Sequence, residues 1–152
     1  MILFRVGKTK YSKDLTGEGA RLHGGRWNHI GTSCIYTSEN RALAVLEYTV
    51  NVNIDDVPRS LSITTFEVPD VSIHELTIAE LPGNWIESPS PTSTKDFGTI
   101  LLNSVKTPII KIPSAIIQQE YNFLLNPIHL ESKNFKILDV KDFIYDVRIK
   151  LV

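Results

Sequence analysis

Short apolar runs recur between polar stretches along the chain, and runs of this kind predict β-strands. The segment 60–68 gives the clearest pattern, because Leu61, Ile63 and Thr65 alternate with polar neighbours as in a half-buried strand. We predict further strands at 2–6, 33–37 and 107–114, and one or two within 134–140 and 143–152.

Two segments carry the spacing or the capping signals of helices. In 39–52 the apolar positions fall on one face of a helix, and Ser38 is placed as its N-cap. Those positions are Ala42, Leu43, Leu46 and Thr49 or Val50. Ser93, followed by Asp96 three residues later, resembles a capping box that opens a second helix through about Val105.

The remaining stretches have weaker patterns. Residues 7–32 are polar and glycine-rich and are typical of a long loop, and 69–91 is expected to be mostly irregular. Residues 115–127 fit either a strand or a helix that ends at Pro127. Because strands and helices mix without strict alternation, the pattern predicts an α+β fold in a single domain over 1–152.

Charge and cysteine content exclude several classes of protein. Lys and Arg number 16 against 17 Asp and Glu, with no block of like charge, so we expect no direct nucleic-acid partner. Cys34 is the single cysteine, which excludes an intramolecular disulfide, and its apolar strand predicts a buried, inert thiol. The N-terminus does not resemble a signal peptide and no apolar run reaches the roughly 18 residues of a membrane span. These features predict a cytoplasmic protein with no membrane partner.

Common cofactor and metal motifs are absent from the sequence. It contains neither G-x-x-x-x-G-K-[ST] nor G-x-S-x-G, and GEGARLHGG lacks the third glycine of a dinucleotide-binding loop. The histidines are not spaced as metal ligands, and we therefore expect no metal site. They are His23, His29, His74 and His129.

The stretch GGRWNHIGTSCIY, residues 24–36, contains two candidate binding residues. Arg26 follows a glycine pair, and its planar guanidinium can offer two donors to a phosphate or carboxylate while backbone N–H groups also approach. The alternative is an ion pair with Glu18 or Glu39. Tyr36 closes a predicted strand, where its ring either faces a cleft or packs in the core.

Three further polar residues lie in apolar surroundings. Arg5 lies inside a predicted strand, where it is either paired or faces water from an edge strand. Glu47 follows apolar residues at the margin of a predicted helix face, where a carboxylate must be paired or used. Ser114, at the end of an apolar strand, can donate to a ligand or cap the next element.

Taken together, three blocks of the sequence resemble the RES domain family. The blocks are FRV, GARLHGGRWNHIGTSCIYTSENRALAVLEY and KIPSAIIQQEYNFLLNPIH, and they run from Phe4 to about His129. Tyrosine follows the arginine of GGRWN by ten residues, and glutamate follows that tyrosine by eleven. RES proteins are toxins of bacterial toxin–antitoxin pairs that act on NAD+ and are similar in fold to ADP-ribosyltransferases. The resemblance thus implies a mixed central sheet flanked by helices.

The resemblance also implies a set of site residues. The implied catalytic residues are Arg26, Tyr36 and Glu47. The implied NAD+-binding residues are Arg5, Arg26, Trp27, Asn28, Tyr36 and Ser114. The tail motif matches Asn122, Asn126 and His129, either as ligand contacts or as residues that hold the fold. Some members have a second aromatic residue where this chain has Val6, so stacking at that position is not expected here.

Plausible roles follow from the chemistry of NAD+. Its nicotinamide ring is already cationic while it is attached to the ribose, so one carboxylate suffices where ordinary glycosides need two. Glu47 would bind the ribose hydroxyls and stabilise the developing positive charge. Arg5 and Arg26 would hold the pyrophosphate. Tyr36 would stack on or flank the nicotinamide, and Ser114 would hydrogen-bond the nicotinamide–ribose end or a phosphate.

The implied function is cleavage of the nicotinamide–ribose bond of NAD+, by a glycohydrolase or a phosphorylase that depletes cellular NAD+. NAD+ is then a substrate, and no cofactor is expected. One alternative is transfer of ADP-ribose to a protein, and a second is a non-catalytic nucleotide-binding or interaction module. The partner implied by the resemblance is a cognate, helical, DNA-binding antitoxin that covers the active site.

Overall fold

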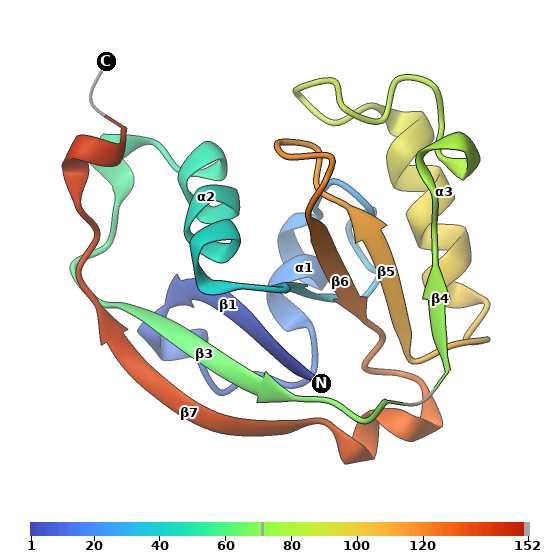
Figure 1. The fold of residues 1–152 in the computed structure, drawn as a ribbon, viewed down its shortest axis with the longest axis horizontal. Coiled ribbons are helices and arrows are strands. Elements are labelled where there is room, and N and C mark those ends of the chain that lie inside the picture. Colours follow the sequence, from blue (N-terminus) through green and yellow to red (C-terminus); the bar gives the residue numbers. More distant parts are fainter. Residues whose placement is uncertain (71, 151–152) are drawn as a thin grey trace.

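A computed structural model describes residues 1–70 and 72–150 of the chain (Figure 1). Its strands are β1 Ile2–Lys8, β2 Ile35–Ser38, β3 Leu61–Glu67, β4 Ile73–Glu75, β5 Ile109–Pro113, β6 Tyr121–Leu125 and β7 Lys136–Phe143. Its helices are α1 Glu18–His23, α2 Arg41–Asn51 and α3 Thr92–Asn103. Short 3-10 turns are η1 Thr9–Tyr11, η2 Ile54–Asp56, η3 Ile78–Glu80, η4 Leu130–Asn134 and η5 Val147–Ile149.

The strands of the described residues form one seven-stranded sheet in the order β4-β5-β6-β2-β1-β3-β7. β4 and β5 are parallel, and every other neighbouring pair is antiparallel. The sheet is therefore mixed and the helices lie against it, which confirms the predicted α+β fold.

The sheet opens between β1 and β2. These strands pair at a single position, Phe4 with Ser38, whereas β1 pairs with β3 along its whole length. In Figure 1, β1, β3 and β7 run at a steep angle to β4, β5 and β6. Helix α2 contacts both β1 and β2. The opening, with α2 beside it, creates the space for a site within a continuous sheet.

Apolar side chains cover both faces of the central strands. Along β5, Ile110 and Ile112 pack in a cluster with Trp27 and Trp85, while Ile109 belongs to a cluster on the opposite face. This alternation follows from the two-residue period of a strand. It explains why the sequence of β5 is apolar almost throughout, as is typical of a strand buried on both faces.

Helix α2 was predicted over 39–52 with Ser38 as its cap, and the structure confirms the helix but not the cap. Asn40 is the N-cap, and its Oδ1 accepts a hydrogen bond from the Leu43 N–H at 2.7 Å. Ser38 is instead the last residue of β2. The predicted apolar face is also partly wrong: the buried positions are Leu43, Ala44 and Thr49, whereas Ala42 and Val50 are exposed.

Helix α3 begins close to the predicted position, but the predicted capping box is wrong. Its N-cap is Pro91, which has no side-chain hydrogen bond. Ser93 donates to Asn84 Oδ1 at 2.8 Å, and Asp96 pairs with His29 at 2.6 Å. The polar residues of the first turns therefore attach the helix to neighbouring loops instead of satisfying its own free N–H groups.

Several elements were not foreseen from the sequence. The predicted loop 7–32 contains α1, and the irregular stretch 69–91 contains β4 and η3. The ambiguous stretch 115–127 contains the strand β6. The C-terminal part forms one strand, β7, followed by η5, and the end of the predicted strand 143–152 lies outside the described residues.

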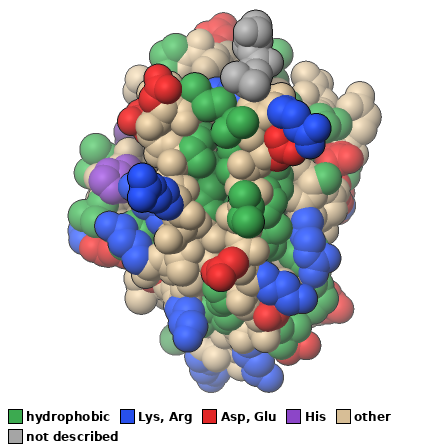
Figure 2. Space-filling model, turned by 90° about the vertical axis from the view of Figure 1, so that its left-hand side faces the viewer, with side chains coloured by type: hydrophobic (Ala, Val, Ile, Leu, Met, Phe, Trp, Pro, Cys, Tyr) green, Lys and Arg blue, Asp and Glu red, His purple; other side chains and the backbone are tan. Residues whose placement is uncertain are grey.

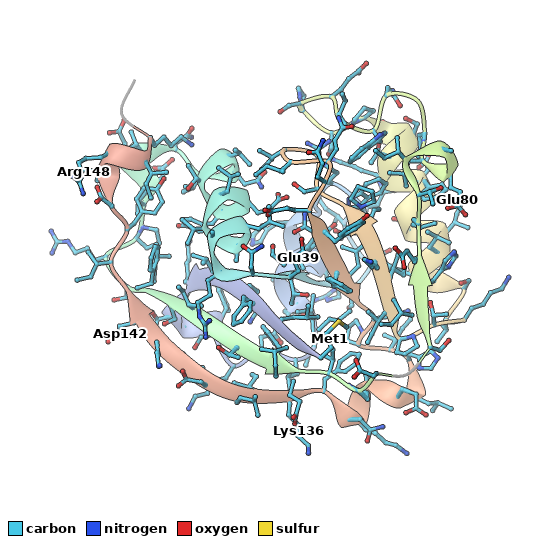
Figure 3. The ribbon with its side chains drawn as sticks, in the orientation of Figure 1. Met1, Glu39, Glu80, Lys136, Asp142 and Arg148 are labelled. Carbon is cyan, nitrogen blue, oxygen red and sulfur yellow. The ribbon has the colours of Figure 1, made fainter. Side chains whose placement is uncertain are left out.

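The surface mixes charges of both signs. On the face that carries β7 and the C-terminal part of the chain, Figure 2 shows apolar side chains along the middle with both basic and acidic ones around them. In Figure 3, Lys136 and Asp142 point outward from the edge strand β7, and charges on an edge oppose pairing with another sheet. Across 1–70 and 72–150, no helix is long and apolar enough to cross a membrane.

Gly98 sets how closely α3 approaches the rest of the molecule. A Cβ at this position would overlap the carbonyl oxygen of Trp27 and lie 2.8 Å from its carbonyl carbon. We expect Gly98→Ala to lower the free energy of unfolding by about 2 kcal/mol or more, measured by urea denaturation, because backbone atoms must move. Gly19→Ala is the matched control: Gly19 is also helical, nothing lies within 4 Å of its Cβ position, and alanine favours a helix. Equal stability of Gly98→Ala and the parent would contradict the close contact.

Candidate active site

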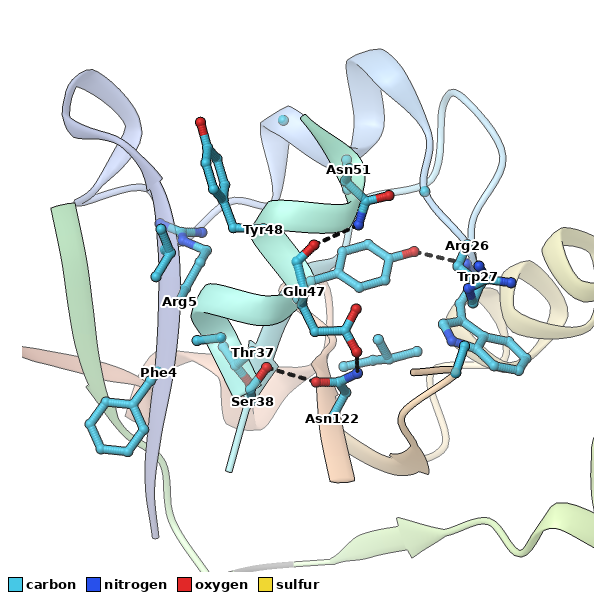
Figure 4. Close-up of a pocket in the computed structure, with 18 of the residues that line it drawn as sticks. Phe4, Arg5, Arg26, Trp27, Thr37, Ser38, Glu47, Tyr48, Asn51 and Asn122 are labelled. Carbon is cyan, nitrogen blue, oxygen red and sulfur yellow. Dashed lines mark hydrogen bonds between the residues drawn. The ribbon is translucent and has the colours of Figure 1, made fainter. Parts of the chain in front are cut away.

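A cavity of about 490 Å³ lies where β1 and β2 separate, beside α2 (Figure 4). Its lining comes from β1, α1, the loop after α1, β2, α2, β6 and the loop after β5. The polar and aromatic lining residues are Phe4, Arg5, Arg26, Trp27, Tyr36, Thr37, Ser38, Glu47, Tyr48, Asn51 and Asn122. In Figure 4, Glu47 lies between Arg5 on one side and Arg26 on the other.

Glu47 is the carboxylate of this cavity. It is half-buried on α2, and its Oε1 accepts two hydrogen bonds, from Ser114 at 2.8 Å and from Asn122 Nδ2 at 2.5 Å. Its Oε2 makes no hydrogen bond to any residue of 1–70 or 72–150. One oxygen is therefore fixed by the protein while the other remains available at the cavity.

Ser114 lies outside the cavity lining, where a residue that contacts the ligand would be expected. Its side chain is fully buried, and its hydroxyl donates to Glu47. The same oxygen accepts hydrogen bonds from the N–H groups of Ile116 and Ile117, at 3.1 and 3.2 Å. Ser114 therefore orients the carboxylate of Glu47, and its contact with NAD+ stays a prediction.

The hydroxyl of Tyr36 holds the loop after α1. It donates to Asn28 Oδ1 at 2.7 Å and accepts from the backbone N–H of Trp27 at 3.0 Å. Burial raises the pKa of this hydroxyl well above its ordinary value. The second glycine of the pair has a clear cause here, because a Cβ on Gly25 would lie 2.6 Å from the Tyr36 oxygen. The ring of Tyr36 lines the cavity, while its hydroxyl is occupied by the protein.

Arg26 does not pair with Glu18 or Glu39, the alternatives left open by the sequence. Its Nη1 donates to the carbonyl oxygens of Trp85 and Glu87, at 2.7 and 2.8 Å. Arg26 therefore anchors the segment between η3 and α3 at the rim of the cavity. Its Nε and Nη2 make no hydrogen bond within the described parts of the chain, so those donors can meet an anion.

Arg5 is not an edge-strand residue, because β1 lies inside the sheet, and its side chain is partly buried. Its Nη2 lies 2.9, 3.3 and 3.5 Å from the carbonyl oxygens of Tyr11, Ser12 and Asp14. Burial lowers the pKa of the guanidinium, an effect that the Asp14 carboxylate opposes. Arginine remains protonated under such conditions. The residue thus supplies a positive charge to the cavity from a position fixed by main-chain oxygens.

Trp27 and Asn28, both predicted to bind NAD+, are largely structural in this arrangement. Trp27 is only 4% exposed and stacks on Trp85 with ring centroids 6.1 Å apart, so little of it reaches the cavity. Asn28 is fully buried and does not line the cavity. Its amide donates to the carbonyl oxygens of Ala20, His29 and Thr32. Asn28 therefore fixes the fold of the loop that carries Arg26.

The three residues of the tail motif separate into two groups. Asn122 lines the cavity and contacts Glu47. Asn126 is fully buried and donates to the Leu102 carbonyl oxygen at 2.8 Å, which connects the end of β6 to α3. His129 caps η4 by accepting from the Glu131 N–H. Asn126 and His129 thus hold the fold, away from the cavity.

Sequence analysis missed five of the polar and aromatic lining residues: Phe4, Thr37, Ser38, Tyr48 and Asn51. Tyr48 and Asn51 follow Glu47 by one and four residues on α2, so helical periodicity from Glu47 indicates Asn51 as a neighbour. Phe4 and Ser38 are the single paired position between β1 and β2. Only strand pairing brings them together, and the sequence carries no local signal for it.

Neither a metal site nor a reactive thiol is found among residues 1–70 and 72–150. No group of three or more His, Cys, Asp or Glu side chains in this part of the chain is placed to hold a metal ion. Cys34 is 2% exposed, and burial raises the pKa of its thiol, which confirms the predicted buried position. The polar and aromatic lining of the cavity contains one carboxylate, two arginines, and hydroxyl, aromatic and amide groups.

Fold and cavity together describe an α+β protein with a single carboxylate between two cations. The RES domain model matches residues 2–146, so the chain belongs to the RES domain family and the resemblance seen in the sequence is confirmed.

Relatives cover nearly the whole chain. The Prs ADP-ribosylating toxin of Sphingobium sp. (strain YBL2) is 35% identical over 145 residues, which cover 93% of this chain and 90% of that protein. Toxin Res of Yersinia enterocolitica is 34% identical over 155 residues, 99% of this chain and 100% of that protein. The chain is thus a homologue of RES-family toxins.

A solved structure shares the fold. A chain in the crystal structure of the M. tuberculosis MbcT–MbcA toxin–antitoxin complex superimposes with a TM-score of 0.74 at 17% sequence identity. The match covers 93% of this chain and 83% of that chain. The mixed sheet is therefore a known architecture.

Removing the Tyr36 hydroxyl tests its structural role. In Tyr36→Phe, the Trp27 N–H and Asn28 Oδ1 lose their partner, so we expect the free energy of unfolding to fall by about 1–3 kcal/mol. Urea denaturation measures the change. Tyr48→Phe is the matched control, because Tyr48 lines the same cavity and its hydroxyl has no hydrogen-bond partner within residues 1–70 and 72–150. If both variants are as stable as the parent, the hydroxyl does not hold the loop.

Proposed function

We propose that the chain is the toxin of a toxin–antitoxin pair and cleaves the nicotinamide–ribose bond of NAD+. With water as acceptor, the products are nicotinamide, ADP-ribose and a proton. With phosphate as acceptor, the ribose carbon is phosphorylated instead. The observation that carries the proposal is the Glu47 carboxylate, with one oxygen held by Ser114 and Asn122 and the other available in a cavity that also contains Arg5 and Arg26.

The charges of the cavity suit this reaction. Loss of nicotinamide leaves positive charge on the ribose, and a carboxylate with fixed orientation stabilises that charge without reorganising. Because nicotinamide leaves as a neutral molecule, no general acid is needed. The occupied hydroxyl of Tyr36 fits this requirement: its ring is the part that can flank nicotinamide.

The two arginines suit the dinucleotide. They line one cavity and both are already oriented by main-chain carbonyl oxygens, so little side-chain entropy is lost when an anion binds. A pyrophosphate between them would place the nicotinamide ribose within reach of Glu47, which lies between them in Figure 4. A cognate DNA-binding antitoxin would then regulate the toxin by covering this cavity. The toxin–antitoxin complex named for the structural neighbour supports such a partner.

Glu47→Gln tests the enzyme directly. The amide keeps the shape and one oxygen for Ser114 and Asn122 but removes the charge, so we expect nicotinamide release from NAD+ to fall at least roughly 100-fold. The measurement uses the purified chain without antitoxin, with and without phosphate, and phosphate-dependent release indicates phosphorolysis. Glu67→Gln, on β3 away from the cavity, is the control. Parental rates in Glu47→Gln would exclude the assigned role, and no release by folded parent would favour protein modification or a binding module.

Transfer of ADP-ribose to a protein is the second candidate. It is favoured by the relative from Sphingobium, which is named an ADP-ribosylating toxin and is 35% identical to this chain. Both reactions share the bond-breaking step and differ in the acceptor, so the same Glu47 would serve either.

Labelled NAD+ separates the two candidates. The parent chain is incubated with bacterial lysate and NAD+ labelled in its adenylate part, with Glu47→Gln in parallel. Transfer predicts a labelled protein band that the variant fails to produce. Cleavage predicts labelled ADP-ribose or its phosphate in the soluble fraction, with no such band.

A further inference from the structure

The carboxylate of Glu47 is the last member of a hydrogen-bonded chain that begins on β2. Ser38 donates to Asn122 Oδ1 at 2.7 Å, and Asn122 Nδ2 donates to Glu47 Oε1 at 2.5 Å (Figure 4). Ser38 is 3% exposed. The three residues come from β2, β6 and α2, so the chain crosses from the sheet to the helix.

Ser38 and Glu47 hold opposite ends of the Asn122 amide. An amide has a donor end and an acceptor end, and only the donor end can meet a carboxylate favourably. The Glu47 carboxylate only accepts hydrogen bonds, so it selects the NH₂ end, while the Ser38 hydroxyl donates to Oδ1 and holds the far end of the amide. Turned around, the amide would place its oxygen against the carboxylate. Water has little access to replace the Ser38 hydroxyl, because the side chain is buried.

The two donors to Glu47 meet the same oxygen from different elements. Ser114 approaches from the end of β5 and Asn122 from β6, and both end at Oε1. Their convergence leaves Oε2 for the cavity. Ser114 is held by the N–H groups of Ile116 and Ile117, and Asn122 is held by Ser38. Separate hydrogen bonds therefore hold each of the two donors to the carboxylate in place.

We propose that Asn122 and Ser38 are positioning residues for the bond-breaking step, with Ser38 fixing the amide so that Asn122 directs Glu47 Oε2 at the ribose. The proposal rests on the proposed function and adds two residues to its machinery. Neither residue needs to touch the reacting atoms. Their effect should appear mainly in kcat, because the carboxylate's orientation matters most when positive charge develops.

Ser38→Ala tests the outer member of the chain. Without the hydroxyl the amide loses the hydrogen bond that holds its Oδ1 end in place, and we expect kcat for nicotinamide release to fall roughly tenfold with KM little changed. Ser62→Ala is the matched control: Ser62 is also a buried serine of the sheet, and its hydroxyl bonds to Thr9, away from the cavity. A parental kcat in Ser38→Ala overturns the proposal.

Asn122→Asp tests the contact with Glu47 through pH. The introduced carboxyl faces Glu47, and two carboxyl groups so close share one proton. When the pair holds one proton, the introduced carboxyl can donate a hydrogen bond to Glu47. When both carboxyl groups are ionised, their negative charges repel each other. The ratio of the variant's kcat to the parent's should therefore fall at least roughly tenfold between pH 5 and pH 8. Arg5 and Arg26 line the cavity in both proteins, so the ratio isolates the pair. A ratio that is the same at every pH overturns the proposal.

A stability measurement separates this proposal from the proposed function. The introduced carboxyl has a raised pKa in the folded state, so the stability of Asn122→Asp relative to the parent is greatest at acid pH and is lost as pH rises. Thermal unfolding midpoints from pH 5 to pH 8 measure this without substrate. If the parent releases no nicotinamide but the midpoint difference grows with pH, the proposed reaction fails while the Asn122–Glu47 contact stands. If the difference between the unfolding midpoints of the variant and the parent does not change with pH, the Asn122–Glu47 contact is contradicted.

Discussion

β1 and β2 meet at one position, Phe4 with Ser38, and the rest of the molecule is arranged around the opening that this single pairing leaves. A fully paired sheet would fill this space with ladder hydrogen bonds and leave no room for polar side chains. Here α2 lies beside the gap, and Asn40 fixes its start, so that Glu47 faces the cavity two turns later. Ser38 belongs both to the pairing and to the hydrogen bonds of the carboxylate. The pairing of β1 with β2 therefore also determines where the side chains of the site lie.

The polar groups of the cavity are held before any ligand arrives. Glu47 is oriented by Ser114 and Asn122, and Arg5 by three carbonyl oxygens of the turn that follows β1. The loop of Arg26 is fixed by Tyr36 and by the buried amide of Asn28. Catalysis by charge stabilisation depends on such prior orientation, because dipoles that must turn during the reaction reduce the gain. The buried polar network thus serves function as well as stability.

The sequence allowed the fold class, most strands and both long helices to be predicted, since each has a local period or composition. It also identified Glu47, Arg26 and Tyr36, which the structure places in one cavity. Motif residues alone, however, do not distinguish a ligand contact from its support. Ser114 and Asn28 prove to be buried because of strand and loop packing, which depends on residues distant in sequence. The pairing of Phe4 with Ser38 is non-local in the same way.

The attachment of Arg26 to Trp85 and Glu87 joins two regions that are far apart in the chain. Only Nη1 is used, so one guanidinium can hold the rim segment and present its other edge to an anion. Two groups that share a cation are thermodynamically linked, and the linkage is reciprocal. If attachment of the rim segment to Arg26 changes the affinity for an anion by some factor, anion binding changes the equilibrium of that attachment by the same factor. Substitutions in the segment 85–87 thus act on the cavity through its arginine, without lining it.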